Sequence, residues 1–108
     1  VIVFPQYDRG FFDRDFRRMA RDFAELSAAA IAELGSSVDA SQVVYSGHSK
    51  GAYVALNALG YPEARRALLP RQAVLFAVAG SDREALAQVP RGLPVTLVVG
   101  DRDGITPL

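Results

Sequence analysis

The chain has 108 residues, half of them hydrophobic and 22% charged, a balance typical of a soluble globular domain and not of a disordered segment. Its twelve basic and twelve acidic residues cancel, so the net charge gives no reason to expect nucleic acid or a membrane surface as a partner. The absence of cysteine excludes disulfides, thiolate metal sites and a cysteine nucleophile, and no apolar run reaches the roughly 20 residues that span a bilayer.

Short β-branched runs alternate with longer helical stripes along the chain, which predicts an α/β fold with a mostly parallel sheet and crossover helices. The expected order is β-α-β-α-β-α-β, arranged as a three-layer sandwich. Strands are expected at residues 1–4, 42–46, 73–79 and 93–99, and helices at 13–34, 50–59, 63–69 and 82–88. Because the first strand-like run starts at Val1, we expect residues 1–108 to be part of one longer domain.

The predicted helix at 13–34 has apolar residues at three- and four-residue steps, a stripe that we expect to lie on the sheet. The stripe comprises Phe16, Met19, Ala20, Phe23, Leu26, Ala30, Ile31 and Leu34. Asp13 and Asp15 suit the N-terminus of this helix, and Gly35 suits its C-terminal cap. The arginines near its start alternate with aspartates, which indicates a solvated helix face.

The pentapeptide Gly47-His48-Ser49-Lys50-Gly51 follows a buried-strand pattern and precedes a helix rich in alanine. In this strand–turn–helix setting the turn lifts the Ser49 hydroxyl to the carboxyl edge of the sheet, where it can act as a nucleophile. We expect a side chain at Gly47 or Gly51 to collide with the neighbouring strand or helix. The alternative is that Ser49 merely caps the helix through its hydroxyl.

Lys50 follows the serine directly, so its N–H is the expected donor to a developing oxyanion. Such a donor is worth roughly 3 to 4 kcal/mol in an acyl-transfer site. The ammonium group of Lys50 is expected to be exposed, and attraction of an anionic or polar substrate is the alternative.

The segment VVYSGHSKGAYVAL resembles the strand, nucleophile elbow and following helix of the α/β-hydrolase family, and the resemblance extends over all 108 residues. It implies a partial α/β-hydrolase fold and a serine hydrolase that forms an acyl-enzyme on Ser49. In this family the triad acid follows a later strand, in a turn of the form Gly-x-x-Asp. Residues 95–107 match that pattern, which makes Asp103 the expected acid and Asp101 the less favoured one. Ordinary turn chemistry is the alternative for both aspartates.

The general base is not evident, because His48 is the only histidine of the chain and directly precedes the nucleophile. Adjacent side chains diverge in a sharp turn, so we expect His48 to pack and hydrogen-bond within the elbow. The family resemblance implies a catalytic histidine after the acid, outside this chain. It also implies a further strand between the counterparts of residues 1–4 and 43–45, so we expect a gap there. The isolated chain is therefore predicted to be marginally stable and inactive.

The loop from Pro5 to Phe12 leaves the same sheet edge as the serine, where open α/β sheets bind ligands. Tyr7, Phe11 and Phe12 are the candidates to line a substrate pocket there, although aromatic residues entering a helix are more often core. The short connection at 80–94 leaves no room for a cap domain, which resembles compact carboxylesterases, dienelactone hydrolases and polyester depolymerases. The expected partner is a small-molecule ester or acyl substrate, with no metal or other cofactor.

Two other functions stay open at this point. The run Asp101-Arg102-Asp103-Gly104-Ile105-Thr106 resembles the DxDGT motif of haloacid-dehalogenase-type phosphatases, in which Asp101 would be the nucleophile beside Mg²⁺. That alternative leaves the glycine-flanked serine unexplained. The other is a non-catalytic fragment that only binds a ligand or partner, since the expected base lies outside the chain. The sequence indicates neither the compartment nor the oligomeric state.

Overall fold

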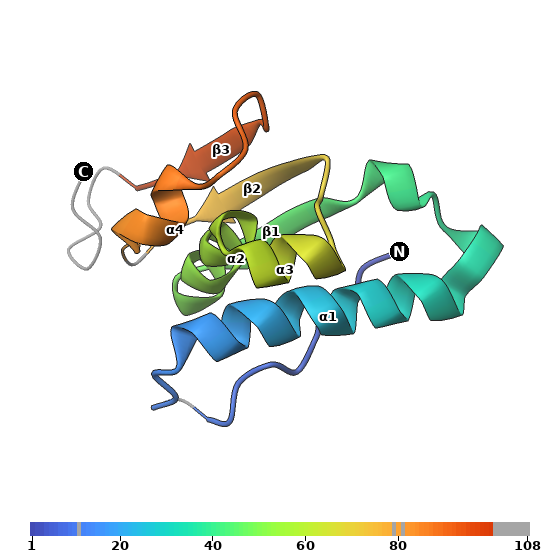
Figure 1. Ribbon diagram of the computed structural model, residues 1–108, viewed down its shortest axis with the longest axis horizontal. Helices are drawn as coiled ribbons and strands as arrows, with labels where there is room; N and C mark the ends of the chain where they lie inside the picture. The colour runs from blue at the N-terminus through green and yellow to red at the C-terminus, as the bar shows by residue number, and fades with distance from the viewer. Residues whose placement is uncertain (11, 79, 81, 101–108) are drawn as a thin grey trace.

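A three-stranded parallel sheet forms the centre of the computed structural model, which describes residues 1–10, 12–78, 80 and 82–100 (Figure 1). The strands are β1 (Val44–His48), β2 (Gln72–Phe76) and β3 (Val95–Val98), in the spatial order β1-β2-β3. Parallel neighbours need crossover connections, and helices supply them here. The predicted α/β class with a parallel sheet is therefore confirmed.

Four α-helices lie among the described residues. α1 (Phe16–Leu34) precedes β1, α2 (Lys50–Gly60) and α3 (Pro62–Ala67) join β1 to β2, and α4 (Arg83–Ala87) joins β2 to β3. Two 3-10 turns, Gly35–Ser37 and Ala40–Gln42, separate α1 from β1. All these helices lie within a few residues of their predicted positions.

α1 begins and ends at residues with capping groups. The Asp15 carboxylate accepts a hydrogen bond from the Arg18 N–H at 3.2 Å, which satisfies one of the unpaired amides of the first turn. Gly35 ends the helix with a φ of 55°, a conformation that glycine adopts without strain.

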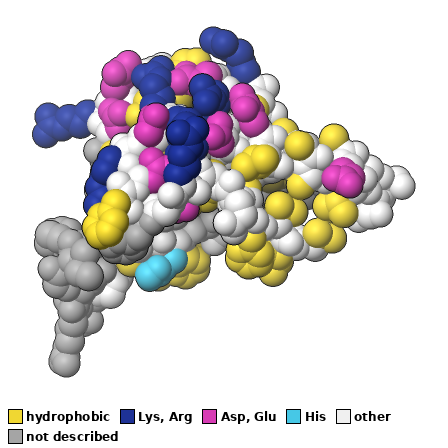
Figure 2. All heavy atoms as spheres, turned by 90° about the horizontal axis from the view of Figure 1, so that it is seen from below, with side chains coloured by type: hydrophobic (Ala, Val, Ile, Leu, Met, Phe, Trp, Pro, Cys, Tyr) yellow, Lys and Arg dark blue, Asp and Glu magenta, His cyan; other side chains and the backbone are white. Residues whose placement is uncertain are grey.

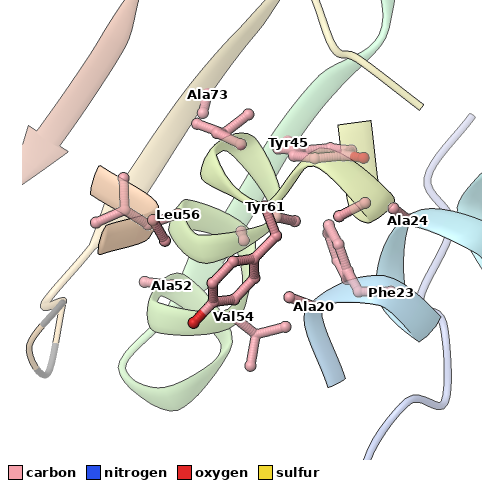
Figure 3. Close-up of a cluster of buried hydrophobic side chains, with 14 of the residues drawn as sticks. Ala20, Phe23, Ala24, Tyr45, Ala52, Val54, Leu56, Tyr61 and Ala73 are labelled. Carbon is pink, nitrogen blue, oxygen red and sulfur yellow. The ribbon is translucent and has the colours of Figure 1, made fainter. Parts of the chain in front are cut away.

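The hydrophobic core lies between the helices and one face of the sheet, and Figure 3 shows its central part. The buried face of α1 packs against α2 and α3. It reaches the sheet where the rings of Phe23 and Tyr45 meet, with centroids 4.8 Å apart. Leu26, expected in the apolar stripe, is 43% exposed. Because α1 packs mainly on α2 and α3, its apolar stripe lies on other helices and not on the sheet as predicted.

The helices cover only one face of the sheet. Tyr45 and Leu75 point into the core and are 3% and 0% exposed. Alternate residues of a strand point to opposite faces, and on the second face Val44, Phe76 and Val98 are 40–46% exposed. No helix in the described part of the chain covers this second face. The described residues thus form two layers, and the predicted three-layer arrangement is not present in them.

Residues 1–4 form no strand, which corrects the first predicted strand. Val1, Ile2 and Phe4 are 80–88% exposed. A β-branched run becomes a strand only where a neighbouring strand shares its backbone hydrogen bonds. Among the described residues, β1 pairs only with β2. A groove lined by both residues 1–4 and β1 lies along α1, where the sequence predicted a gap.

Arg18 organises the loop that precedes α1. Its guanidinium donates to the Asp22 carboxylate at 2.8 Å, to the Tyr7 carbonyl at 2.9 Å and to the Asp13 carboxylate. Asp13 also accepts a hydrogen bond from the Arg9 N–H at 3.0 Å, and this bond is the main reason why the pKa of Asp13 lies below its usual value. The Arg18 side chain is only 12% exposed, so the predicted solvated face includes one arginine that fixes a loop.

Gly60, the last residue of α2, lies where this helix approaches α4 most closely. A Cβ atom at Gly60 would stand 1.9 Å from the carbonyl oxygen of Ala85. In the sequence this glycine directly follows the predicted helix at 50–59. The structure gives it a second role, because only glycine permits this helix–helix contact.

Candidate active site

Ser49 stands at the junction between β1 and α2, at the carboxyl end of the strand. Its backbone has a φ of 54° and a ψ of −116°. Residues with a side chain rarely adopt positive φ, and holding one there costs roughly 1 to 3 kcal/mol. Within the described ranges, Ala77 is the only other non-glycine residue with positive φ. The strain arises because the strand runs into the helix with Ser49 as the single intervening residue.

The Ser49 hydroxyl does not cap α2. Although Ser49 occupies the N-cap position, its side chain makes no capping hydrogen bond. Its backbone is held instead, since the Ser49 N–H donates to the Phe76 carbonyl at 2.9 Å and the Ser49 carbonyl accepts from the Tyr53 N–H at 3.0 Å. The hydroxyl of this half-buried residue is therefore left for other chemistry.

Gly47 and Gly51 flank the serine but have different roles. A Cβ atom at Gly47 would lie 2.6 Å from the carbonyl carbon and oxygen of Gly51, a distance that backbone atoms cannot tolerate. A Cβ atom at Gly51 would meet only the Tyr7 hydroxyl, at an ordinary contact distance of 3.4 Å. The predicted steric need for glycine thus holds at Gly47 and is wrong at Gly51, whose Cβ direction faces the loop and not a strand or helix.

Backbone hydrogen bonds continue across the carboxyl ends of all three strands. Beside the bond from Ser49 to Phe76, the Ala77 N–H donates to the Val98 carbonyl at 2.8 Å. These bonds fix Ser49 at the sheet edge where parallel α/β sheets bind ligands.

Lys50 is the first residue of α2, so its N–H belongs to the turn whose amides have no partner within the helix. Its ammonium nitrogen lies 3.4 Å from a carboxylate oxygen of Asp8 and 3.3 Å from the Gly10 carbonyl oxygen. The Lys50 side chain is 27% exposed. The ammonium group is thus not freely exposed as expected, because it binds the loop that precedes α1.

The loop residues proposed for the substrate pocket differ in their placement. Tyr7 is half-buried, and its ring packs edge-on against Phe23 with centroids 5.6 Å apart. Burial, with a smaller contribution from Asp8, raises the pKa of Tyr7. Phe12 is 80% exposed, and Phe11 lies outside the described residues. Tyr7 reaches the serine turn, because its hydroxyl is the nearest atom to a Cβ added at Gly51, at 3.4 Å.

His48 is exposed at the end of β1, opposite Phe76 in the sheet register. In Figure 2 the single histidine, drawn in cyan, lies at the surface beside hydrophobic side chains. The prediction that it packs and hydrogen-bonds within the turn is therefore wrong. Its side chain belongs to the uncovered sheet face, because successive strand residues point to opposite faces.

The expected acids, Asp101 and Asp103, lie outside the described residues. Residues 1–10, 12–78, 80 and 82–100 contain no cluster of three His, Asp or Glu side chains that could hold a metal ion. No helix in these ranges is long and apolar enough to cross a membrane.

The sequence did not identify two partners of the site, Asp8 and the Phe76 carbonyl. A signal for Asp8 was present, since an acidic residue in a loop at the same sheet edge can pair with Lys50. The Phe76 carbonyl carries no such signal, because any residue at that strand end would offer the same oxygen.

A groove of about 1130 Å³ opens beside the serine turn. It is lined by Tyr7, Gly47, His48 and Gly51 at one end and by apolar side chains of α1 and β1 further along. No protein family, curated protein or solved structure matches this chain.

Proposed function

We propose that this chain is the central part of an α/β-hydrolase-type serine hydrolase domain, with Ser49 as the nucleophile. The substrate is a carboxylic ester or a related small acyl compound, and the reaction passes through an acyl-enzyme on Ser49. No cofactor is required for this chemistry.

The observation that carries this proposal is the backbone of Ser49. A φ of 54° at a non-glycine residue is strained, and the hydroxyl makes no capping bond that would account for the serine. Two residues before it, glycine is sterically required at position 47. A strained, uncapped serine between a parallel strand and a helix is what the sharp turn of a nucleophile elbow requires.

The Lys50 N–H supports the same function from the first turn of α2. This amide has no partner within the helix and adds to the positive end of the helix dipole. A tetrahedral intermediate on Ser49 develops negative charge on its oxygen, and a preorganised amide stabilises that charge without reorganisation.

The proposed reaction also needs an acid and a general base. Asp103 is the proposed acid, which would orient an imidazole and stabilise its protonated form. The general base is a histidine outside these 108 residues, because His48 is exposed on the face of the sheet and next to the nucleophile.

A fluorophosphonate probe tests the nucleophile in the protein that contains this chain. We expect labelling of Ser49 that is lost in Ser49→Ala and kept in His48→Ala. Labelling that does not depend on Ser49 would disprove the assignment. Loss of labelling in His48→Ala, in a variant that still folds, would show that the base is His48 and not an external histidine.

With the 108-residue chain alone, we expect esters to be hydrolysed no faster than they are spontaneously in buffer. Rapid hydrolysis of an activated ester by this chain, abolished in Ser49→Ala, would show that the base lies within it.

A further inference from the structure

Lys50 is the only lysine among the twelve basic residues of the chain, and it directly follows the proposed nucleophile. It is the first residue of α2, where the positive end of the helix dipole disfavours a cation. An anionic partner close by offsets this cost. That partner is Asp8, whose Oδ2 atom lies 3.4 Å from the Lys50 Nζ atom. This ion pair therefore sets the charge beside Ser49.

The loop that carries Asp8 is held on α1 as well as on α2. On the α1 side, the Arg18 guanidinium donates to the carbonyl of Tyr7, the residue before Asp8, at 2.9 Å. On the α2 side, the Gly10 carbonyl oxygen lies 3.3 Å from the Lys50 Nζ atom. Contacts on both sides of Asp8 thus fix its carboxylate at the first turn of α2. Neither Asp8 nor Lys50 lines the groove along β1.

Asp13 is a second carboxylate whose charge interacts with that of Lys50. The pKa of Asp13 is lowered mainly by the hydrogen bond from the Arg9 N–H, with Lys50 as a smaller cause. Its carboxylate is already bound by the Arg18 guanidinium. Because Arg18 balances the charge of Asp13, Asp8 is the carboxylate that balances Lys50.

An unbalanced ammonium group at this position would act on the substrates of Ser49. Since Lys50 adjoins Ser49 in the chain, its ammonium group lies within about 10 Å of the Ser49 Cα atom. At that distance near a protein surface, one unit charge changes the interaction with another by roughly 5-fold. A neutral pair gives a carboxylate on the substrate no cation to bind, and burying that carboxylate is costly.

We infer that Asp8 is a specificity-determining residue of the proposed hydrolase, which cancels the charge of the Lys50 ammonium group so that the site favours uncharged esters over esters that carry a carboxylate. This inference rests on the proposed function, because it concerns the substrates of Ser49. Asp8 has no step of the reaction assigned to it, since it acts through Lys50.

Two nitrophenyl esters test the inference in the protein that contains this chain. Their acyl chains have the same length, and one ends in a carboxylate while the other ends in a carboxamide. The measured quantity is kcat/KM for the carboxylate ester divided by kcat/KM for the carboxamide ester. This ratio isolates the charge of the substrate, because a charge near α2 also acts on the oxyanion formed from either ester.

Asp8→Asn keeps the shape of the side chain and removes its charge. In the wild type the carboxamide ester should be the better substrate. In Asp8→Asn the ratio should rise by about 5-fold at low salt, because the ammonium group is no longer balanced. The increase should shrink in about 0.5 M salt, which a purely structural role of Asp8 would not explain.

Changing the other partner should shift the ratio the opposite way. Lys50→Met keeps the backbone N–H and leaves the Asp8 charge unbalanced, so the ratio should fall below that of the wild type. Combining Asp8→Asn with Lys50→Met makes the pair neutral again and should return the ratio to near the wild-type value. The matched control is Glu63→Gln, which removes a carboxylate from the 2.6 Å ion pair with Arg17 between α1 and α3 and should leave the ratio unchanged. Circular dichroism checks that each variant is folded.

A second measurement tests the ion pair without the reaction. Reductive methylation of Lys50, followed by peptide mass spectrometry, should be about 2- to 5-fold faster in Asp8→Ala than in the wild type, because the ammonium group loses the contact that restrains it. Equal rates would overturn the inference, whatever the reaction of Ser49.

Ser49→Ala separates this inference from the proposed function. If this variant loses hydrolysis of the carboxamide ester while Asp8→Asn has the wild-type ratio, only the inference is overturned. A wild-type preference for the carboxylate ester would overturn it in the same way. If hydrolysis does not depend on Ser49, the proposed function is wrong and the inference is wrong with it.

Discussion

The N–H of Ser49 donates a hydrogen bond of 2.9 Å to the carbonyl oxygen of Phe76, so a bond of the sheet holds the serine in its positive-φ conformation. β1 thus stays bonded to β2 one residue beyond its last regular residue, His48. The strain is sustained because both elements around Ser49 are fixed, β1 by β2 and α2 by the core. Such strain lowers stability and is found mainly at functional sites.

Ser49→Gly should stabilise the chain, because glycine adopts positive φ without strain. We expect the free energy of unfolding to rise by about 1 kcal/mol, less than the strain itself because glycine also gains entropy in the unfolded state. Ser49→Ala keeps the strain and should change stability by less than about 0.5 kcal/mol. Urea unfolding followed by circular dichroism measures both. A loss of about 1 kcal/mol in Ser49→Ala would instead mean that the hydroxyl caps α2.

Gly47→Ala and Gly51→Ala form a matched pair on the two sides of the serine. The methyl group at Gly47 would meet backbone atoms at 2.6 Å, so we expect a loss of more than about 2 kcal/mol or failure to fold. The methyl group at Gly51 would make only an ordinary contact, and alanine favours the helix, so the change should stay within about 1 kcal/mol. Equal losses in the two variants would contradict this difference in packing.

Gly60→Ala should separate α4 from α2. Its methyl group would stand 1.9 Å from the Ala85 carbonyl oxygen, and neither helix backbone can yield without repacking. We expect a loss of more than about 2 kcal/mol in the free energy of unfolding. Gly100→Ala is the control, since no atom of the described residues lies within 4 Å of the added Cβ, and it should change stability by less than about 0.5 kcal/mol.

Asp82 gives the stability of the chain an acid-sensitive component. The hydrogen bond from the Tyr61 hydroxyl, with further bonds from the Glu84 and Ala85 amides, holds the pKa of Asp82 below its usual value of 3.8. Because the folded-state pKa is the lower one, this contribution is present above pH 3.8 and is lost as the pH falls through the folded-state pKa.

Thermal unfolding between about pH 5 and pH 2 measures this component. We expect the Tm of Asp82→Asn to fall less steeply with decreasing pH than that of the wild type. Tyr61→Phe removes the hydroxyl donor and should flatten the same part of the profile. Parallel pH profiles of wild type and Asp82→Asn would show that the aspartate is not stabilised in the folded chain.

Much of the fold was predictable because its signals are local. The Val-Val-Tyr run, the glycine-flanked serine and the alanine-rich helix that follows specify β1, the turn and α2 from adjacent residues. The β-branched runs that predict β2 and β3 are likewise local signals. For these elements the local sequence was sufficient to predict approximately where they begin and end.

The wrong predictions concern features that depend on contacts between residues far apart in the sequence. Residues 1–4 have the composition of a strand, but strand formation needs a partner that β1 does not give them. Gly51 and Gly60 are both glycines near helix ends, and only three-dimensional packing shows that Gly60 is crowded while Gly51 is not. The placement of His48 on an uncovered face likewise follows from which face the helices cover.

The strand order β1-β2-β3 also bears on how the serine turn is held. Paired positions lie about 20 to 30 residues apart, so each strand reaches its neighbour through a crossover that contains a helix. The unit from β1 through α2 and α3 to β2 already contains Ser49 and the Phe76 carbonyl that holds it. The backbone bonds that hold the strained turn therefore lie within this unit, since the partners of Ser49 are Phe76 and Tyr53.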